Sequence, residues 1–281
     1  YKKKYTDKNL IFFLRKYYGD NKYELLKKRL ADSNFSLLKC DNCNFIWQEN
    51  SPDDKFTTEL YDEIIDKEKS LNKSVLKFKN HRFSNRKEIT FISKQFSYIK
   101  KINILDFGAG WGHWLNSGNK EEFNPYAFEL SSERKKYLLN LGINIIDSNV
   151  IDKYENFFHY IRIDQVLEHV YSLQKTLRVL KKLAKKDCLF YLSVPDGSKI
   201  LSNKSKIEIK KGPIQPLEHL NCFSRNSLNK LLSQEGFVNI TLLEIFFMHM
   251  KILLYGKINL SLFLKDIRDC FVSTSIKFKI K

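Results

Sequence analysis

The chain has 281 residues, of which 43% are hydrophobic, so it is long enough and apolar enough to bury a sizeable globular core. No apolar run reaches the length of a membrane-spanning helix; the most apolar late stretch, Ile252–Leu264, is interrupted by Gly256, Lys257 and Asn259. The net charge of +17 comes mostly from scattered Lys, which disfavours a dedicated nucleic-acid surface and fits a small anionic substrate at least as well.

Residues 1–95 are rich in lysine and aromatic residues and predict a mainly helical N-terminal extension. Helical periodicity covers four segments: Asn9–Tyr18, Tyr23–Leu30, Thr57–Lys69 and Ser84–Ile99. Between them, Phe35–Lys39 has the pattern of a strand that leads into a C-x-x-C pair, Cys40 and Cys43.

The cysteine content is typical of a cytoplasmic protein. Five cysteines are an odd number and do not suggest a disulfide framework. Three of them stand singly in apolar or strand-like surroundings, where they are expected to be small buried residues: Cys188, Cys222 and Cys270.

Between residues 96 and 260 the pattern changes to alternating strands and helices. The first five expected strands are Ile102–Phe107, Tyr126–Leu130, Ile143–Ile146, Tyr160–Val166 and Leu189–Val194. The expected helices are Trp111–Asn116, Ser132–Leu141, Leu173–Lys186 and Arg225–Glu235. Such alternation predicts a Rossmann-like α/β fold, a parallel sheet with helices on both faces and right-handed crossovers.

The last third of the chain is expected to close this sheet. Two further strands are predicted at Val238–Phe247 and Lys251–Tyr255. A polar stretch at 195–220 precedes them and is expected to form a lid over the substrate, and 261–281 is expected to be a basic C-terminal tail.

A glycine-rich turn follows the first predicted strand of the sheet. The spacing is D-x-G-x-G-x-G, with Asp106, Gly108, Gly110 and Gly112. A dinucleotide fingerprint requires glycine where this chain has His113, so a nicotinamide-dependent function is disfavoured. The turn resembles the first motif of class I S-adenosylmethionine-dependent methyltransferases.

Three later segments make this resemblance specific to a branch that methylates small molecules. Asp164–Val170, with the letters DQVLEHV, resembles the branch's segment at the end of strand four. Leu217–Ser224, followed by Leu228, Leu231, Leu232, Gly236 and Phe237, is similar to its "eHlnyFs…L…ll…GF" element, and Leu192–Asp196 resembles the end of its strand five. The resemblance covers about residues 100–240. It departs at His159, where an Asp usually opens strand four, and around Lys186 and Asp187, where a glycine is usual.

The resemblance implies a seven-stranded, mostly parallel sheet whose last strand is antiparallel, and S-adenosylmethionine as the cofactor. It further implies a small-molecule acceptor, with a sugar or nucleotide-sugar methylated on oxygen or carbon as the first expectation. Two alternatives stay open, which are methylation of a nucleic acid and an inactive methyltransferase-like scaffold that binds a partner. Oligomeric state is not predicted.

The cofactor-binding residues are expected around the ends of the first strands. The predicted set is Asp106, Gly108, Ala109, Gly110, Gly112, Glu129, Leu130, Asp147 and Gln165. Bare glycine backbone and the amides of the next helix admit the amino-acid end of the cofactor, Glu129 accepts both ribose hydroxyls, and Asp147 meets the adenine amine. Three of these residues have structural alternatives. The Asp106 carboxylate only orders the turn, the Glu129 charge favours the start of the next helix, or Asp147 is an ordinary turn residue.

Two histidines are the catalytic candidates. His169 and His219 carry imidazoles that titrate near neutrality and are suited to remove a proton from the acceptor. Each has a structural alternative, as a loop cap for His169 and as a backbone hydrogen-bonding group for His219. Methyl transfer itself depends on in-line alignment and does not require a strong base.

Cys40 and Cys43 supply half of a four-ligand zinc site. In the branch that this chain resembles, another C-x-x-C lies upstream and here would precede Tyr1, so a structural zinc is expected in the full-length protein. The alternative is a pair of ordinary thiols.

Overall fold

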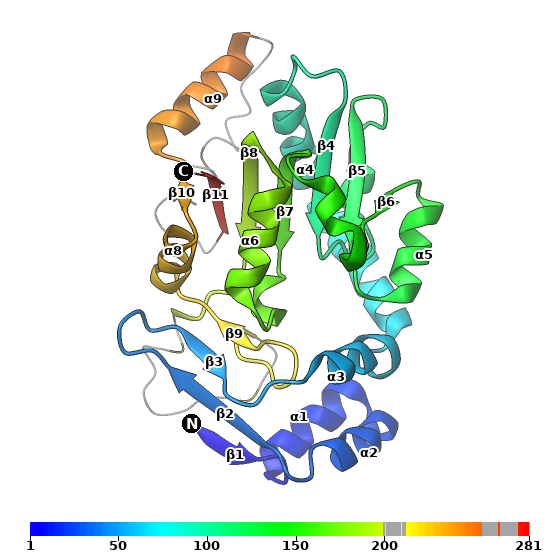
Figure 1. Cartoon of the computed structure of the whole chain (residues 1–281). Helices are drawn as coiled ribbons and strands as arrows, with labels where there is room; N and C mark the ends of the chain where they lie inside the picture. The colour runs from blue at the N-terminus through cyan, green and yellow to red at the C-terminus, as the bar shows by residue number, and fades with distance from the viewer. Residues whose placement is uncertain (199, 201–208, 210–211, 255–263, 265–274, 281) are drawn as a thin grey trace.

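The computed structural model describes residues 1–198, 200, 209, 212–254, 264 and 275–280. Its largest feature is a seven-stranded sheet in the order β10-β11-β8-β7-β4-β5-β6 (Figure 1). The strands are β4 (Ile102–Phe107), β5 (Phe123–Phe128), β6 (Asn144–Ile145), β7 (Phe158–Asp164), β8 (Ala184–Ser193), β10 (Phe237–Asn239) and β11 (Ser275–Ile280). Only β11 runs antiparallel to its neighbours, which confirms the predicted Rossmann-like, mostly parallel sheet.

Helices cover both faces of this sheet because its strands are apolar on both sides. On one face pack α6 (Leu173–Leu183) and α8 (Arg225–Gln234), and on the other α4 (Lys67–Gln95) and α9 (Leu242–Leu254). The buried leucines of α6 recur at helical spacing, at Leu173, Leu177, Leu180 and Leu183. Alternate residues of each strand therefore enter different cores, as Leu105 and Ile104 of β4 do.

The shorter elements around the sheet are α5 (Ser132–Asn140) and a series of 3₁₀ helices, η2 (Leu115–Ser117), η3 (Ser148–Tyr154) and η4 (Leu167–His169). Ser224 begins α8 in a capping box with Ser227, which supplies hydrogen bonds at the helix start. Within the described part of the chain, none of the helices combines the length and the hydrophobicity needed to cross a lipid bilayer.

The N-terminal extension is mainly helical, with a small sheet of its own (Figure 1). Its helices are α1 (Lys8–Tyr18), α2 (Asp20–Arg29), α3 (Asp54–Glu59) and the π-helix η1 (Leu60–Ile64). Its strands β1 (Lys2–Lys4), β2 (Asn34–Lys39) and β3 (Ile46–Gln48) form a sheet with β9 (Asn221–Cys222) in the order β1-β2-β3-β9. The core of the extension also takes in Ile214 and Leu217, so this part of the chain folds around residues that follow the main sheet.

Three sequence predictions are corrected by the structure. The segment Leu242–Leu254 is helix α9 and not strand, because Thr241 and Glu244 form reciprocal hydrogen bonds that begin a helix. The closing antiparallel strand is β11, so 275–280 belongs to the sheet and not to a tail. The predicted helix Trp111–Asn116 is replaced by turns and η2, because Gly110 and Gly112 have φ values of 56° and 69°, outside the α-helical region.

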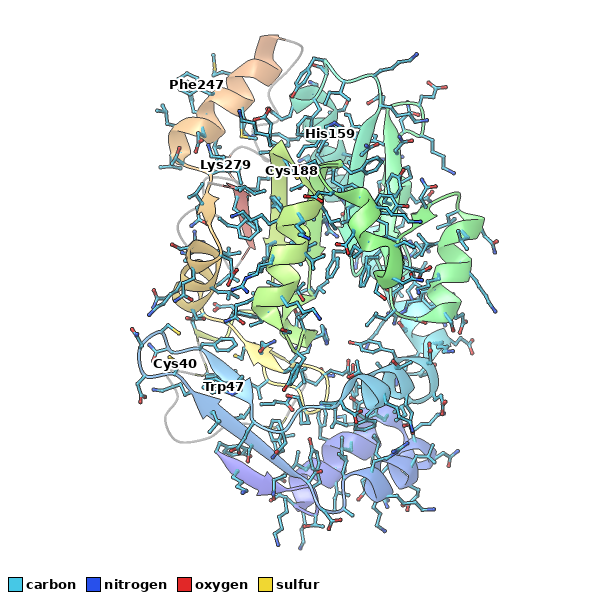
Figure 2. The ribbon with its side chains drawn as sticks, viewed as in Figure 1. Cys40, Trp47, His159, Cys188, Phe247 and Lys279 are labelled. Atoms are coloured by element: carbon cyan, nitrogen blue, oxygen red, sulfur yellow. The ribbon has the colours of Figure 1, made fainter. Side chains whose placement is uncertain are left out.

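Two other expectations concern particular places in the fold. His159, labelled in Figure 2, accepts a hydrogen bond at Nδ1 from the Asn103 backbone N–H at 3.0 Å, so the imidazole ties the start of β7 to β4. Within the predicted lid at 195–220, residues 199, 201–208 and 210–211 lie outside the described part of the chain. The described end of the lid, 212–220, packs against the extension.

We expect Leu180→Ala to lower the free energy of unfolding by about 2–5 kcal/mol, because Leu180 is fully buried between α6 and the sheet. Leu139→Ala is the matched control, since Leu139 is 57% exposed on α5 and its truncation should change stability by less than about 0.5 kcal/mol. Urea denaturation measures both values, and equal losses would contradict the packing described for α6.

Candidate active site

A cavity of about 760 Å³ lies at the carboxyl ends of β4, β5 and β7. Three segments of the main sheet line one wall: 107–108, 128–130 and 165–166. The N-terminal extension lines the other, with side chains that include Tyr17, Tyr61, Lys69 and Ser70. Ligands of open parallel sheets bind where these strand ends meet, and the volume is that of a small-molecule pocket.

Glu129 is a buried carboxylate in the wall of this cavity. Its Oε2 accepts a hydrogen bond from the Gly110 backbone N–H at 2.8 Å, and its Oε1 accepts from the N–H groups of Leu130 and Ser131 at 2.9 and 3.0 Å. An Arg134 guanidinium nitrogen lies 3.6 Å from the same Oε1. The carboxylate therefore joins the glycine-rich turn to the end of β5 and holds both in one arrangement.

Two glycines of the turn lie against different neighbours. Gly108 lines the cavity with φ at 81°, and a Cβ there would lie 2.5 Å from Cγ2 of Val166. Gly112 has φ at 69°, and a Cβ there would lie 2.3 Å from Cδ2 of Leu138. Only Gly108 keeps backbone open to the cavity, whereas Gly112 allows the turn to pack against α5.

Asp106 does not line the cavity but belongs to a buried charged cluster beneath it. Its Oδ1 lies 3.6 Å from a terminal nitrogen of Arg162, whose other terminal nitrogen donates to Asp164 Oδ2 at 2.7 Å. The Arg162 side chain also lies 3.6 Å from Oε1 of Glu88. Burial raises the pKa of Asp106 to about 7, against the opposing effect of Arg162. The structural role for Asp106 is thus favoured over the predicted contact with a cofactor.

We expect Asp106→Asn to remove part of the pH dependence of stability. Because the folded-state pKa of about 7 exceeds the ordinary value of 3.8, the group stabilises the fold at low pH. That contribution is lost as the pH rises from about 4 to about 7. The free energy of unfolding of the Asn variant minus that of the wild type should therefore be larger at about pH 8 than at about pH 5. Urea denaturation at the two pH values measures this difference.

The control for this experiment is Asp152→Asn, which removes a carboxylate that is 87% exposed. Because this carboxylate is largely exposed, its substitution should change stability by less than about 0.5 kcal/mol. A difference for Asp106→Asn that stays constant between the two pH values would contradict the raised pKa.

The two catalytic candidates meet at the side of the cavity. The rings of His169 and His219 lie 4.8 Å apart, centre to centre, at 90° to one another, and His169 lines the cavity. Nδ1 of His169 lies 3.2 Å from the Tyr61 hydroxyl oxygen, and Nε2 lies 3.9 Å from Oε1 of the buried Glu168. Burial lowers the pKa of His169 to about 3, assisted by His219, so its imidazole is neutral near pH 7.

A second polar group beside these histidines connects the extension to residues 212–220. The Tyr18 hydroxyl and the Gln215 side-chain amide each donate to Oε1 of Glu218 at 2.7 Å.

Two residues at the site have strained backbone. Leu217, which precedes Glu218, has a φ of 71°, and Gln165 has a φ of 59°. Such strained non-glycine backbone is held only where the surrounding structure enforces it, and it concentrates at functional sites.

The structure brings together only part of the predicted site. Four predicted cofactor residues line the cavity: Gly108, Glu129, Leu130 and Gln165. The remaining predicted residues of the turn are not part of the cavity lining: Ala109, Gly110 and Gly112. Asp147 lies outside the cavity lining, 54% exposed, with Oδ1 2.6 Å from Nζ of Lys135. This geometry does not support its predicted contact with adenine, because the Lys135 ion pair holds the carboxylate at the surface.

Cys40 and Cys43 are free thiols at the turn between β2 and β3, where Figure 2 labels Cys40. Hydrogen bonds from the backbone of Cys43 and Asn42 lower the pKa of Cys40. Among the described side chains, no third His, Cys, Asp or Glu joins them in a metal-binding group. The predicted zinc site is therefore not supported.

Sequence reasoning missed the residues that the extension contributes. Tyr61 and Lys69 gave no signal, because their distance from the glycine-rich turn in the sequence hides their place in the cavity wall. Glu218 had a signal, since it directly precedes His219 in the segment that resembles the methyltransferase branch. Arg134 also lies close to Glu129 in the sequence, in the first turns of α5.

Comparison with known proteins gives one family. Residues 78–242 match the family model described as "Methyltransferase domain". No curated protein matches the chain. Among solved structures, it is similar to a SAM-dependent methyltransferase from Archaeoglobus fulgidus, at 18% identity and a TM-score of 0.37 over 59% of this chain and 74% of that one.

Two further solved structures show the same degree of similarity. A SAM-dependent methyltransferase from Aquifex aeolicus has 19% identity and a TM-score of 0.39, over 68% of this chain and 92% of its own. A SAM-dependent methyltransferase from Thermotoga maritima, described as a possible histamine N-methyltransferase, has 16% identity and a TM-score of 0.41, over 61% of this chain and 79% of its own.

Proposed function

Because the chain belongs to the methyltransferase domain family, we propose that it transfers the methyl group of S-adenosylmethionine to a small molecule, namely a sugar or nucleotide-sugar, on oxygen or carbon. The observation that carries this proposal is the placement of the Glu129 carboxylate in the cavity wall, beside the open backbone of Gly108. The family alone supports methyl transfer; the acceptor is part of the proposal.

The residues of the cavity fit the cofactor. A carboxylate has about four acceptor positions, and three backbone amides donate to Glu129, so one position is left for a ribose hydroxyl. Leu130 is 59% exposed and lines the cavity, where it offers an apolar surface to a purine ring. At Gly108 a Cβ would overlap the Val166 side chain, so this part of the cavity wall accepts only glycine.

The cofactor supplies a methyl group already activated by a sulfonium, so the protein contributes chiefly alignment. Glu129 and the turn hold one side of the cavity, while His169 and His219 form the side that we assign to the acceptor. A neutral His169 can accept a proton, but its pKa of about 3 makes it a weak base.

Two neighbouring lysines in the cavity wall support an anionic acceptor. The cavity is lined by four cationic side chains, Lys16, Lys69, Lys73 and Arg134, and by three carboxylates, Asp66, Glu129 and Glu218. Lys69 and Lys73 lie one turn apart on α4, so their ammonium groups project from the same side of that helix. Such a pair suits the diphosphate of a nucleotide-sugar, with the sugar directed toward His169.

We expect Glu129→Gln to weaken S-adenosylmethionine binding by about 1–3 kcal/mol, or about 5- to 150-fold, because hydrogen bonds to a charged acceptor are lost. Titration calorimetry measures the dissociation constant. Glu133→Gln is the matched control, since Glu133 is 50% exposed on α5 and pairs with Lys67.

If the wild type and both variants fail to bind S-adenosylmethionine, the enzyme assignment is wrong and the inactive scaffold is favoured. Equal affinities of the wild type and Glu129→Gln would remove Glu129 from the cofactor site.

We expect Lys69→Ala combined with Lys73→Ala to raise the KM for a nucleotide-sugar acceptor by at least about tenfold, with little change in kcat, because ground-state binding is lost. A panel of nucleotide-sugars and isotopically labelled S-adenosylmethionine provides the assay. Lys87→Ala, on α4 over the Phe83 ring and outside the cavity lining, is the control. Methylation of RNA or DNA, with none of the panel, would contradict the acceptor class.

A further inference from the structure

Glu168, His169 and His219 form a cluster that the methyl-transfer proposal does not fully use. One oxygen or nitrogen atom from each of the three lies within 4.8 Å of the other two. Among the described residues, no other group of three His, Cys, Asp or Glu side chains is arranged in this way. Two imidazole nitrogens and one carboxylate oxygen are a ligand set that divalent transition metals take in proteins.

The spacing suits a single ion at the centre of the three groups. Metal–ligand bonds to imidazole and carboxylate are about 2.0–2.2 Å long, which places ligand atoms of a tetrahedral site about 3.4 Å apart. Nε2 of His169 and Oε1 of Glu168 are already 3.9 Å apart. No two of the three ligand atoms are more than 4.8 Å apart, so each pair has to approach by at most about 1.4 Å to reach that spacing.

The two nitrogens of the His169 ring face different partners, and the ring also hydrogen-bonds to the Glu218 backbone. Its Nδ1 faces the Tyr61 hydroxyl at 3.2 Å, while its Nε2 is the nitrogen that lies near Glu168. Histidines that bind metals through one ring nitrogen generally place the other against a hydrogen-bonding partner, which fixes the tautomer. Tyr61 is in this position because the π-helix η1 brings it from the extension into the cavity wall.

Backbone contacts hold the two halves of the cluster together. Asn221 donates from its side-chain amide to the carbonyl oxygens of Leu167 and Val170, at 3.0 and 2.6 Å, on either side of Glu168 and His169. Gln48 of β3 donates to the carbonyl oxygen of His219 at 2.9 Å. A metal site needs ligands that surrounding hydrogen bonds hold in place, and these contacts hold the segments that carry the three side chains.

We propose that Glu168, His169 and His219 bind one divalent transition-metal ion, and that this ion holds the acceptor through two adjacent oxygen atoms. The second part rests on the proposed methyl transfer, whereas the metal binding does not. Three protein ligands leave one position open on a four-coordinate ion and two when the ion expands to five-coordination, as catalytic metal sites do. Because His169 lines the cavity, those positions face the space assigned to the acceptor.

The ion accounts for how an acceptor hydroxyl loses its proton beside a weak base. A metal-bound hydroxyl is more acidic, and its proton passes to water. The oxygen then forms a bond to the methyl carbon while the carbon–sulfur bond breaks. The electron pair of that bond stays on sulfur, which becomes a neutral thioether.

The test is a metal titration that needs neither cofactor nor acceptor. The protein carries Cys40→Ser and Cys43→Ser, because these free thiols bind the same metals. After treatment with a chelator, it is titrated with Co²⁺ followed by visible absorption and with Zn²⁺ followed by calorimetry. We expect one ion per chain, with the Co²⁺ spectrum of a nitrogen and oxygen site.

Two substitutions and one control locate the ion. Glu168→Gln and His219→Gln should each weaken binding by more than about 100-fold, beyond what the loss of a second-shell partner costs. His113→Gln is the control, since that imidazole stacks on Phe78 and bonds to Ser74 outside the cluster. Circular dichroism confirms folding, and His219→Gln decides the matter if Glu168→Gln fails to fold.

Absence of stoichiometric Co²⁺ and Zn²⁺ binding, or equal affinity in His219→Gln and the parent protein, would overturn the metal site. Calorimetry with S-adenosylmethionine is run on the same preparations. Metal binding without S-adenosylmethionine binding would refute the proposed methyl transfer and support the metal site. Binding of S-adenosylmethionine without metal binding would support methyl transfer and refute the metal site.

Discussion

The cavity has two walls because β9 pairs with β3. Ile46 and Trp47 of β3 lie opposite Cys222 and Asn221, which joins the N-terminal extension to a segment that follows the main sheet. Gln48 extends the same attachment through hydrogen bonds to the carbonyl oxygens of Gln215 and His219. Without this pairing, the elements of the extension that precede α4 would not be held over the strand ends of the main sheet, whereas α4 packs on that sheet directly.

Buried charge is compensated locally on both sides of that cavity. Glu129 accepts from three backbone amides and lies beside Arg134, so it needs no rearrangement to present its remaining acceptor position. Beneath the turn, Arg162 is shared among several carboxylates and also lies 5.2 Å from the Trp114 ring. Such clusters remain favourable only when each member has partners, which ties the strand ends of β4 and β7 to α4.

The elements that were predicted well are those with a strong local pattern. The strand Ile102–Phe107 and the amphipathic helix from Leu173 lie where their periodicity places them, because each buries a continuous apolar face. Leu242–Leu254 was missed because a short run of apolar residues fits a buried strand and a buried helix equally well. There the Thr241–Glu244 capping box, a local signal, decides for the helix.

Within the site, the residues next to strand ends were accessible to sequence reasoning, since the topology of a parallel sheet places every strand's carboxyl end at the same edge. Glu129 and Gln165 follow from that rule, and His169 from its position after the fourth strand of the sheet. Tyr61 does not, because nothing in its neighbourhood relates it to a segment more than 100 residues away.

The sequence by itself determined the order of the first five strands of the main sheet, the glycine-rich turn and the acidic residue that bonds to it, because these depend on period and spacing within one stretch of chain. Only the tertiary structure decided which side chains share a space. It placed Asp106 under the sheet and Asp147 at the surface. It also set His169 against His219, because long-range strand pairing and buried hydrogen bonds, and not local pattern, fix those distances.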